Sequence, residues 1–216
     1  MKKLLIILLL LLTACTKVEP IDEEVVRELP KKPIPESSLM SDSPIGAYNI
    51  DEYLFIDDVI YIDTRSPEQF LVNGHIAGFI NIPFYEAIAA FEKKDNVLFT
   101  TKKIRDDDGK IVANIGEPGS FFPNYEESEE YLYHTFPKDK KLVIIATAGV
   151  ESSYLINLLK QYGYDASLLY NAGSMENSLG KNVAYFDLDD PKYVVEGIDS
   201  YRTIITYDWG ELTPIE

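Results

Sequence analysis

The residues best suited to chemistry lie between positions 146 and 153, where the chain reads Ala-Thr-Ala-Gly-Val-Glu-Ser-Ser. This segment follows an apolar run and supplies three hydroxyl groups and one carboxylate, on Thr147, Ser152, Ser153 and Glu151. A serine becomes a nucleophile only when a general base lies within about 2.6–3.2 Å and a third group orients that base. His75 is the only plausible base. Ser152 is better suited to cap the helix that follows than to react.

The cysteine content excludes several other chemistries. Cys15 is the only cysteine, so the folded part has no thiol for covalent catalysis, no internal disulfide and no cysteine-based metal site. The two histidines, His75 and His134, lie far apart and show no metal-ligand spacing. We therefore expect neither a metal nor a cofactor.

The N-terminus has the pattern of a secretion signal. Lys2 and Lys3 precede an apolar run at residues 4–12, and a run of about nine residues is too short to span a hydrocarbon core of roughly 30 Å. Residues 12–15, Leu-Thr-Ala-Cys, resemble the lipobox of bacterial lipoproteins, whose signal is cut before the cysteine and whose cysteine is lipidated. The resemblance implies a signal peptide at 1–14 and a lipid anchor in the bilayer at Cys15, on the extracytoplasmic side of the cell membrane. A plain signal peptide or an apolar anchor is the alternative.

The net charge of the chain limits its possible partners, and the proline and acidic content of residues 15–42 characterises the segment after the signal. The formal net charge is −16, which makes nucleic acid and anionic headgroups poor partners for the surface. Residues 15–42 are rich in proline and acidic side chains. Such a segment buries too little apolar surface to offset its ordering entropy, so we expect it to be a solvated tether.

From residue 43 onward, strand patterns alternate with helical patterns. Strands are expected at 59–62, 78–82, 142–146 and 166–173, and helices at 66–70, 85–94 and 152–163. Ser66 is expected to cap its helix with Pro67 in the first position, and Gly163 to end the last helix. This alternation implies a parallel α/β sheet, in which sites collect beyond the carboxyl ends of the strands. The 146–153 segment lies in that place.

Two parts depart from the alternation. Residues 96–115 have the pattern of a β-hairpin that turns at residues 107–109, and the whole insertion covers about 96–120. The acidic run at 106–108 lacks the alternating oxygens and the distant Glu of an EF-hand, so a turn is favoured over a calcium loop. Residues 182–188 and 201–209 predict further strands in a C-terminal β-rich extension at 181–216.

Residues 61–83 resemble the N-terminal signature of rhodanese-like domains, roughly D-x-R-x-x-x-E-(F/Y)-x-x-G-H-I-x-G-A-x-N-I-P. The matching residues are Asp63, Arg65, Gly74, His75, Ile76, Gly78, Asn81, Ile82 and Pro83. The order of strand, loop, helix and strand at 142–173 also fits the family. The resemblance covers residues 43–180 and implies a rhodanese-like parallel sheet flanked by helices.

The active-site loop departs from the family's pattern, C-x-x-G-x-R-S, in which the cysteine carries sulfur. Gly149 and Ser152 match, but Ala146 takes the place of the cysteine and Glu151 that of the arginine. The degenerate loop consists of Ala146, Thr147, Ala148, Gly149, Val150, Glu151 and Ser152. Glu151 either caps the loop amides itself or gives the pocket a preference for a cationic or neutral ligand.

Asp63, Arg65 and His75 are candidate pocket residues near this loop. For Asp63 and Arg65 the simpler interpretation is a buried pair that fixes the end of their strand. We expect a binding or scaffold protein without sulfurtransferase activity, whose partner is a protein, a peptide or a small ligand. The alternatives are an enzyme that uses a non-cysteine residue or a partner's thiol, and a rigid spacer that presents the hairpin and the tail.

Overall fold

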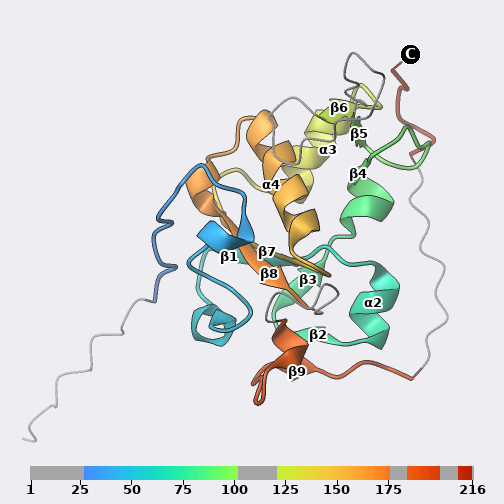
Figure 1. Cartoon of the computed structure of the whole chain (residues 1–216). Coiled ribbons are helices and arrows are strands. Elements are labelled where there is room, and N and C mark those ends of the chain that lie inside the picture. The colour runs from blue at the N-terminus through green and yellow to red at the C-terminus, as the bar shows by residue number, and fades with distance from the viewer. Residues whose placement is uncertain (1–26, 102–120, 176–183, 200–208, 216) are drawn as a thin grey trace, which may run out of the picture.

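The computed structural model describes residues 27–101, 121–175, 184–199 and 209–215 (Figure 1). The predicted signal peptide, Cys15, the hairpin turn at 107–109, the acidic run at 106–108 and most of the strand predicted at 201–209 lie outside the described residues. In the part that is described, no helix is both long and apolar enough to cross a membrane.

A four-stranded parallel sheet forms the centre of the molecule, in the order β3-β1-β7-β8. Its strands are β1 (Val59–Asp63), β3 (Phe79–Asn81), β7 (Lys141–Ala146) and β8 (Leu169–Ser174). In β7 every residue except Lys141 is buried, as expected for a strand covered on both faces. The parallel α/β architecture predicted from the sequence is confirmed.

Three α-helices accompany this sheet: α2 (Pro67–Val72), α3 (Ser128–Thr135) and α4 (Val150–Gln161). Ser66 caps α2 as predicted, because its side chain accepts a hydrogen bond from Gln69 N while the Gln69 side chain bonds back to Ser66 N. The end of α4 is also as predicted, since Gly163 has a φ of +78° directly after the last turn.

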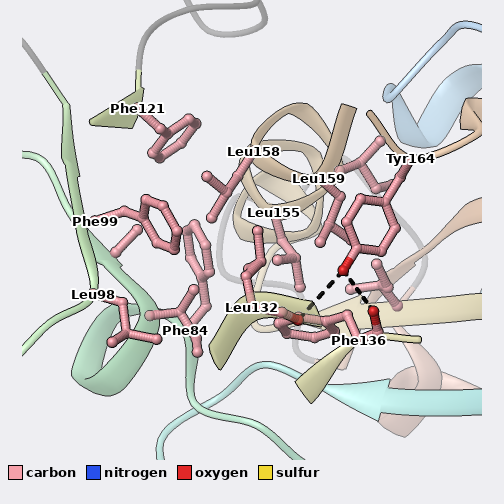
Figure 2. Close-up of a cluster of buried hydrophobic side chains, with 14 of the residues drawn as sticks. Phe84, Leu98, Phe99, Phe121, Leu132, Phe136, Leu155, Leu158, Leu159 and Tyr164 are labelled. Atoms are coloured by element: carbon pink, nitrogen blue, oxygen red, sulfur yellow. Dashed lines mark hydrogen bonds between the residues drawn. The ribbon is translucent and has the colours of Figure 1, made fainter. Parts of the chain in front are cut away.

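The alternating side chains of β7 enter two separate cores. Leu142 and Ile144 join the core under α3 and α4, whereas Val143 and Ile145 join the core on the opposite face. Figure 2 shows the first core, where the Tyr164 hydroxyl donates to Phe136 O at 2.5 Å. The second core is closed by side chains from both ends of the chain: Leu29, Ile45, Ile50, Leu54 and Tyr185.

The described part of the predicted tether, residues 27–42, is packed on the domain and is not a solvated linker. Leu29 is buried in the second core. Lys32 Nζ donates to the carbonyls of Pro35, Ser37 and Ala166 at 2.7–2.8 Å. A 3-10 helix, Met40–Asp42, follows, and a second one spans Ile50–Tyr53. The composition argument was wrong here because one apolar side chain and one satisfied lysine are enough to dock an irregular segment.

The helix predicted at 85–94 is also wrong. The chain forms a π-helix, Phe84–Ile88, and then the short strand β4 (Ala89–Ala90). This strand pairs with β5 (Phe99–Thr101), which pairs antiparallel with β6 (Phe121–Pro123). Pairing with a distant strand and burial of the small Ala89 and Ala90 outweighed local helix propensity.

The described C-terminal residues differ from the first of the two strands predicted there. Within 182–188, the described residues form a 3-10 helix, Tyr185–Asp187, and not a strand. The strand β9 (Val194–Val195) pairs antiparallel with β2 (His75–Ile76). The strand predicted at 166–173 begins later, because Ala166–Leu168 is a 3-10 helix capped by Asp165.

Candidate functional site

The 146–153 segment connects β7 to α4 at the carboxyl edge of the sheet. Ala146 is the last residue of β7 and is 0% exposed. Gly149 precedes the helix with a φ of +78°. A Cβ atom at Gly149 would lie 3.0 Å from Met40 Sδ and 3.2 Å from the Gly173 carbonyl carbon. The loop therefore needs glycine at this position for both its backbone conformation and its close packing.

The side chain of Asn171, in β8, supports the loop through hydrogen-bond contacts. Its side-chain nitrogen lies 3.0 Å from Gly149 O, from Ser38 O and from Ser153 Oγ. Ser153 Oγ in turn donates to Ser38 O at 2.9 Å. The N-terminal segment is thus part of the support of the loop, through the Ser38 carbonyl and the Met40 side chain.

Ser152 is not the helix cap that the sequence analysis expected. The left-handed conformation of Gly149 lets α4 begin at Val150, which places Ser152 inside the first turn. Ser152 is fully buried, and its Oγ atom has no hydrogen-bond partner among the described residues. Its candidate base, His75, is held elsewhere: Nδ1 lies 3.1 Å from Phe70 O, and the ring stacks on Phe70 at 3.8 Å. The structure does not bring these two side chains together into a hydrolytic pair.

Asp63 and Arg65 form a buried ion pair where β1 ends. Arg65 Nη2 lies 2.7 Å from Asp63 Oδ2 and donates to Gly74 O at 2.7 Å. Asn81 Nδ2 donates to the carbonyls of Asp63 and Arg65 at 3.1 and 2.8 Å. This network connects the end of β1 to the turn before β2 and to the end of β3. It holds the strands in place and directs the two charges toward each other.

An open cavity of about 610 Å³ lies beside the first turn of α4. It is lined by Tyr85, Ala90, Phe91, Glu92, Lys94, Val150, Glu151 and Tyr154. Glu151 and Tyr154 come from one face of α4, since residues three apart are neighbours on a helix. Val150 also belongs to α4, and the remaining lining residues come from the π-helix, from β4 and from the segment that follows β4. Of the loop identified in the sequence, Val150 and Glu151 line the cavity, whereas the candidate pocket residues Asp63, Arg65 and His75 do not.

Glu151 brings a negative charge to this cavity. Its Oε2 atom is buried and has no hydrogen-bond partner in the described part of the chain, so this oxygen does not cap the loop amides. Burial and the Glu151 charge together raise the pKa of Tyr85 and of Tyr154 above the ordinary tyrosine value. Both tyrosines therefore stay protonated at neutral pH, and the cavity combines neutral aromatic walls with the carboxylates of Glu92 and Glu151 and the ammonium group of Lys94.

Sequence reasoning missed the aromatic part of this site. Phe91 was expected on the apolar face of a helix, but it follows β4, is 43% exposed and lines the cavity. Tyr85 and Tyr154 were not singled out. The spacing of Tyr154, three residues after Glu151, is the signal that places both on one helical face.

Comparison with known proteins matches the chain to one family and to partial relatives. The family model of the rhodanese-like domain matches residues 50–181. The tRNA-specific 2-thiouridylase MnmA of Rhizobium etli is 32% identical over 76 residues, which cover 33% of this chain and 19% of that protein. The protein of the same name from Sinorhizobium medicae is 33% identical over 76 residues, with the same coverage. The matched segment thus spans about a fifth of the length of these relatives.

Proposed function

The chain belongs to the rhodanese-like domain family, and we propose that it is a binding or scaffold protein without sulfurtransferase activity, held at the outer face of the cell membrane by a lipid on Cys15. The observation that supports the lack of activity is the buried methyl group of Ala146 at the end of β7. The family resemblance puts a cysteine thiol at this position. A methyl group can neither attack sulfur nor carry it.

The charge at the mouth of the loop supports the same proposal. In the family, the resemblance puts an arginine where Glu151 stands, and that cation stabilises an anionic sulfur species. Glu151 reverses the charge, and its Oε2 atom has no hydrogen-bond partner among the described residues that would neutralise it. Thiosulfate and persulfide anions are therefore repelled by the side chain that lines the cavity.

The proposed anchor rests on residues 1–15. The two lysines, the apolar run and the Leu-Thr-Ala-Cys ending form a lipobox pattern. Since the described chain is already packed from Leu29 onward, only a short connection separates Cys15 from the domain. A chain from residue 15 to residue 27 reaches at most about 40 Å when fully extended. The domain would thus stand close to the bilayer surface.

The sulfur-transfer proposal is tested with thiosulfate as donor and cyanide as acceptor. The full chain carrying Cys15→Ser, which removes the one natural thiol, is compared with the same chain carrying Ala146→Cys and Glu151→Arg. We expect no thiocyanate above background from the natural loop and measurable turnover from the restored loop. Turnover by the natural loop would overturn the proposal and require another nucleophile.

An enzyme that borrows a thiol from a partner is the rival function. The same assay with dithiothreitol or glutathione as the acceptor tests it, because a small thiol takes the place of the partner's sulfur. We expect no acceleration over thiol alone. The two thiouridylase relatives match this chain over only 19% of their own length. Their printed names therefore do not favour the rival function.

The anchor is tested by growing a bacterial host that expresses the chain with an alkyne-labelled palmitate. We expect label and membrane association for the natural chain, and neither for Cys15→Ala. Membrane association without label would point to an uncleaved apolar anchor instead.

A further inference from the structure

We propose that the cavity beside α4 binds a small organic cation that carries a quaternary ammonium group, with Tyr85, Phe91 and Tyr154 as its aromatic wall and Glu151 as its counter-charge. The proposal deepens the binding function proposed above and rests on it. It assigns a ligand class opposite in charge to the sulfur anions that the family resemblance implies.

The three aromatic rings pack against one another and form one continuous wall of the cavity. The Phe91 and Tyr154 rings lie 5.0 Å apart at 81°, and the Tyr85 and Tyr154 rings lie 6.4 Å apart at 69°. Tyr85 and Phe91 are 5.5 Å apart at 31°. All three side chains line the cavity, and ring faces that border an open cavity attract a diffuse positive charge.

The wall is also incompletely covered by the protein itself. Phe91 is 43% exposed and Val150 is 37% exposed, and both line the cavity. A concave, largely apolar surface with a few polar groups is the usual form of a small-molecule site, and about 610 Å³ lies within the range of such sites. The volume admits a molecule larger than the ammonium group alone.

Glu151 gives the cavity its charge preference. Glu151 lines the cavity, and its carboxylate charge attracts a cation there. The cavity is also lined by Glu92 and by one cation, Lys94, so carboxylates outnumber ammonium groups. The formal charge of the whole chain, −16, attracts cations over a longer range.

The hydrogen-bonding capacity of the site selects the kind of cation. A primary ammonium has three donors that each require an acceptor, whereas aromatic faces supply attraction without being strong acceptors. A quaternary ammonium has no donors and buries its methyl groups against the rings. It therefore needs no acceptor in the cavity and is held by the ring faces and by the charge of Glu151.

The test is isothermal titration calorimetry of the full chain, purified in a nonionic detergent, with choline chloride as the probe. Its neutral isostere, 3,3-dimethyl-1-butanol, and sodium thiosulfate are titrated in parallel at equal ionic strength. We expect choline to bind about tenfold more tightly than the neutral isostere, and thiosulfate not to bind. Equal binding of choline and the isostere would overturn the proposal, because the site would then be merely apolar.

Substitutions assign the binding to this cavity. Glu151→Gln and Phe91→Leu are each expected to weaken choline binding about tenfold, and Lys94→Gln to strengthen it. The matched controls, Glu130→Gln and Tyr48→Leu, change an exposed glutamate and an exposed tyrosine outside the cavity and are expected to have no effect. Circular dichroism of each variant separates loss of binding from loss of folding. An effect of the control variants as large as that of the cavity variants would overturn the assignment.

The outcomes also separate this inference from the proposed function. If folded protein does not bind choline and remains silent in the sulfur-transfer assay, the cation proposal fails and the inactive binding domain stands. If thiosulfate binds and is turned over, both fail. Choline binding together with silence in the sulfur-transfer assay supports both.

Discussion

At the end of β1, Asp63 and Arg65 neutralise each other inside a buried network. At the end of β7, on the neighbouring strand of the same sheet, Glu151 and Ser152 each have a buried oxygen without a hydrogen-bond partner among the described residues. Both ends lie at the carboxyl edge, where parallel α/β sheets hold their sites. At the first end the two opposite charges are paired with each other, whereas at the second end Glu151 has no ion-pair partner among the described residues and lines a cavity.

The difference indicates which end serves the fold and which serves binding. An unpartnered buried polar group costs about 1–3 kcal/mol, and natural proteins keep such costs mainly where a function requires them. The β1 end retains the family signature and determines the strand geometry. The β7 end has Ala146 where the family resemblance implies a cysteine, and under the proposed function its cavity serves binding.

The largest effect is expected at the satisfied end. Arg65→Met removes one partner of a buried ion pair and leaves Asp63 charged and unpaired, which should lower the free energy of unfolding by about 3–5 kcal/mol. Urea denaturation monitored by circular dichroism measures the change. Glu151→Gln is the matched control at the open end and should change stability by less than about 0.5 kcal/mol. Similar losses of unfolding free energy for both variants would contradict the distinction between the two ends.

A smaller loss in the free energy of unfolding is expected when Asn171, which supports the loop, is replaced. Asn171→Leu leaves Gly149 O and Ser38 O without the amide that lies 3.0 Å from each, and should cost about 1–3 kcal/mol in the same urea measurement. Asn157→Leu is the matched control on α4, because Asn157 Nδ2 is buried and has no partner among the described residues. That variant should be neutral or stabilising. A loss as large as that of Asn171→Leu would contradict the hydrogen-bond argument.

Alkaline pH extends the comparison to two tyrosines of the first core, the partly buried Tyr162 and the buried Tyr164, whose hydroxyl donates to Phe136 O. Burial raises the pKa of Tyr162 to about 12 and also raises that of Tyr164, whereas an unfolded tyrosine titrates near 10. The folded state thus keeps its protons longer, and this stabilisation is complete below about pH 10 and lost as pH rises from there through about 12.

The expected loss is on the order of 1 kcal/mol for Tyr162 after allowance for its partial exposure. Unfolding free energies between pH 8 and 12, with tyrosinate absorbance recorded in parallel, measure it. Tyr164→Phe should reduce the pH-dependent part of the loss. Stability that is constant up to pH 12 would show that these hydroxyls ionise freely in the fold.

The smallest effects are expected at two adjacent serines, and they should have opposite signs. Ser153→Ala removes the bond from Oγ to Ser38 O and should cost about 1 kcal/mol. Ser152→Ala removes a buried hydroxyl without a partner and should be neutral or stabilising by up to about 1 kcal/mol. Thermal unfolding of both variants measures the difference. A loss at Ser152 alone would indicate an interaction of that hydroxyl beyond the described residues.

Local patterns were sufficient where an element is specified by its own residues. The apolar run of β7, the alternation of strands and helices, and the cap and first residue of α2 were readable because period and capping are short-range properties. The predictions failed where pairing or packing with another segment decided the outcome. Ala89 and Ala90 pair with β5 instead of continuing a helix, and Leu29 docks into a core that also contains Val143, Tyr170 and Tyr185.

The sequence by itself determined that the one cysteine of the chain stands at position 15 and that an alanine stands at position 146. It also determined the family and the parallel sheet. Only the tertiary structure decided what surrounds Glu151. Tyr85 and Phe91 meet Tyr154 across the cavity through the path of the backbone between Pro83 and β5. That path depends on the pairing of β4 with β5 and on the burial of Ala89 and Ala90. The local pattern of residues 85–94 does not predict either of them.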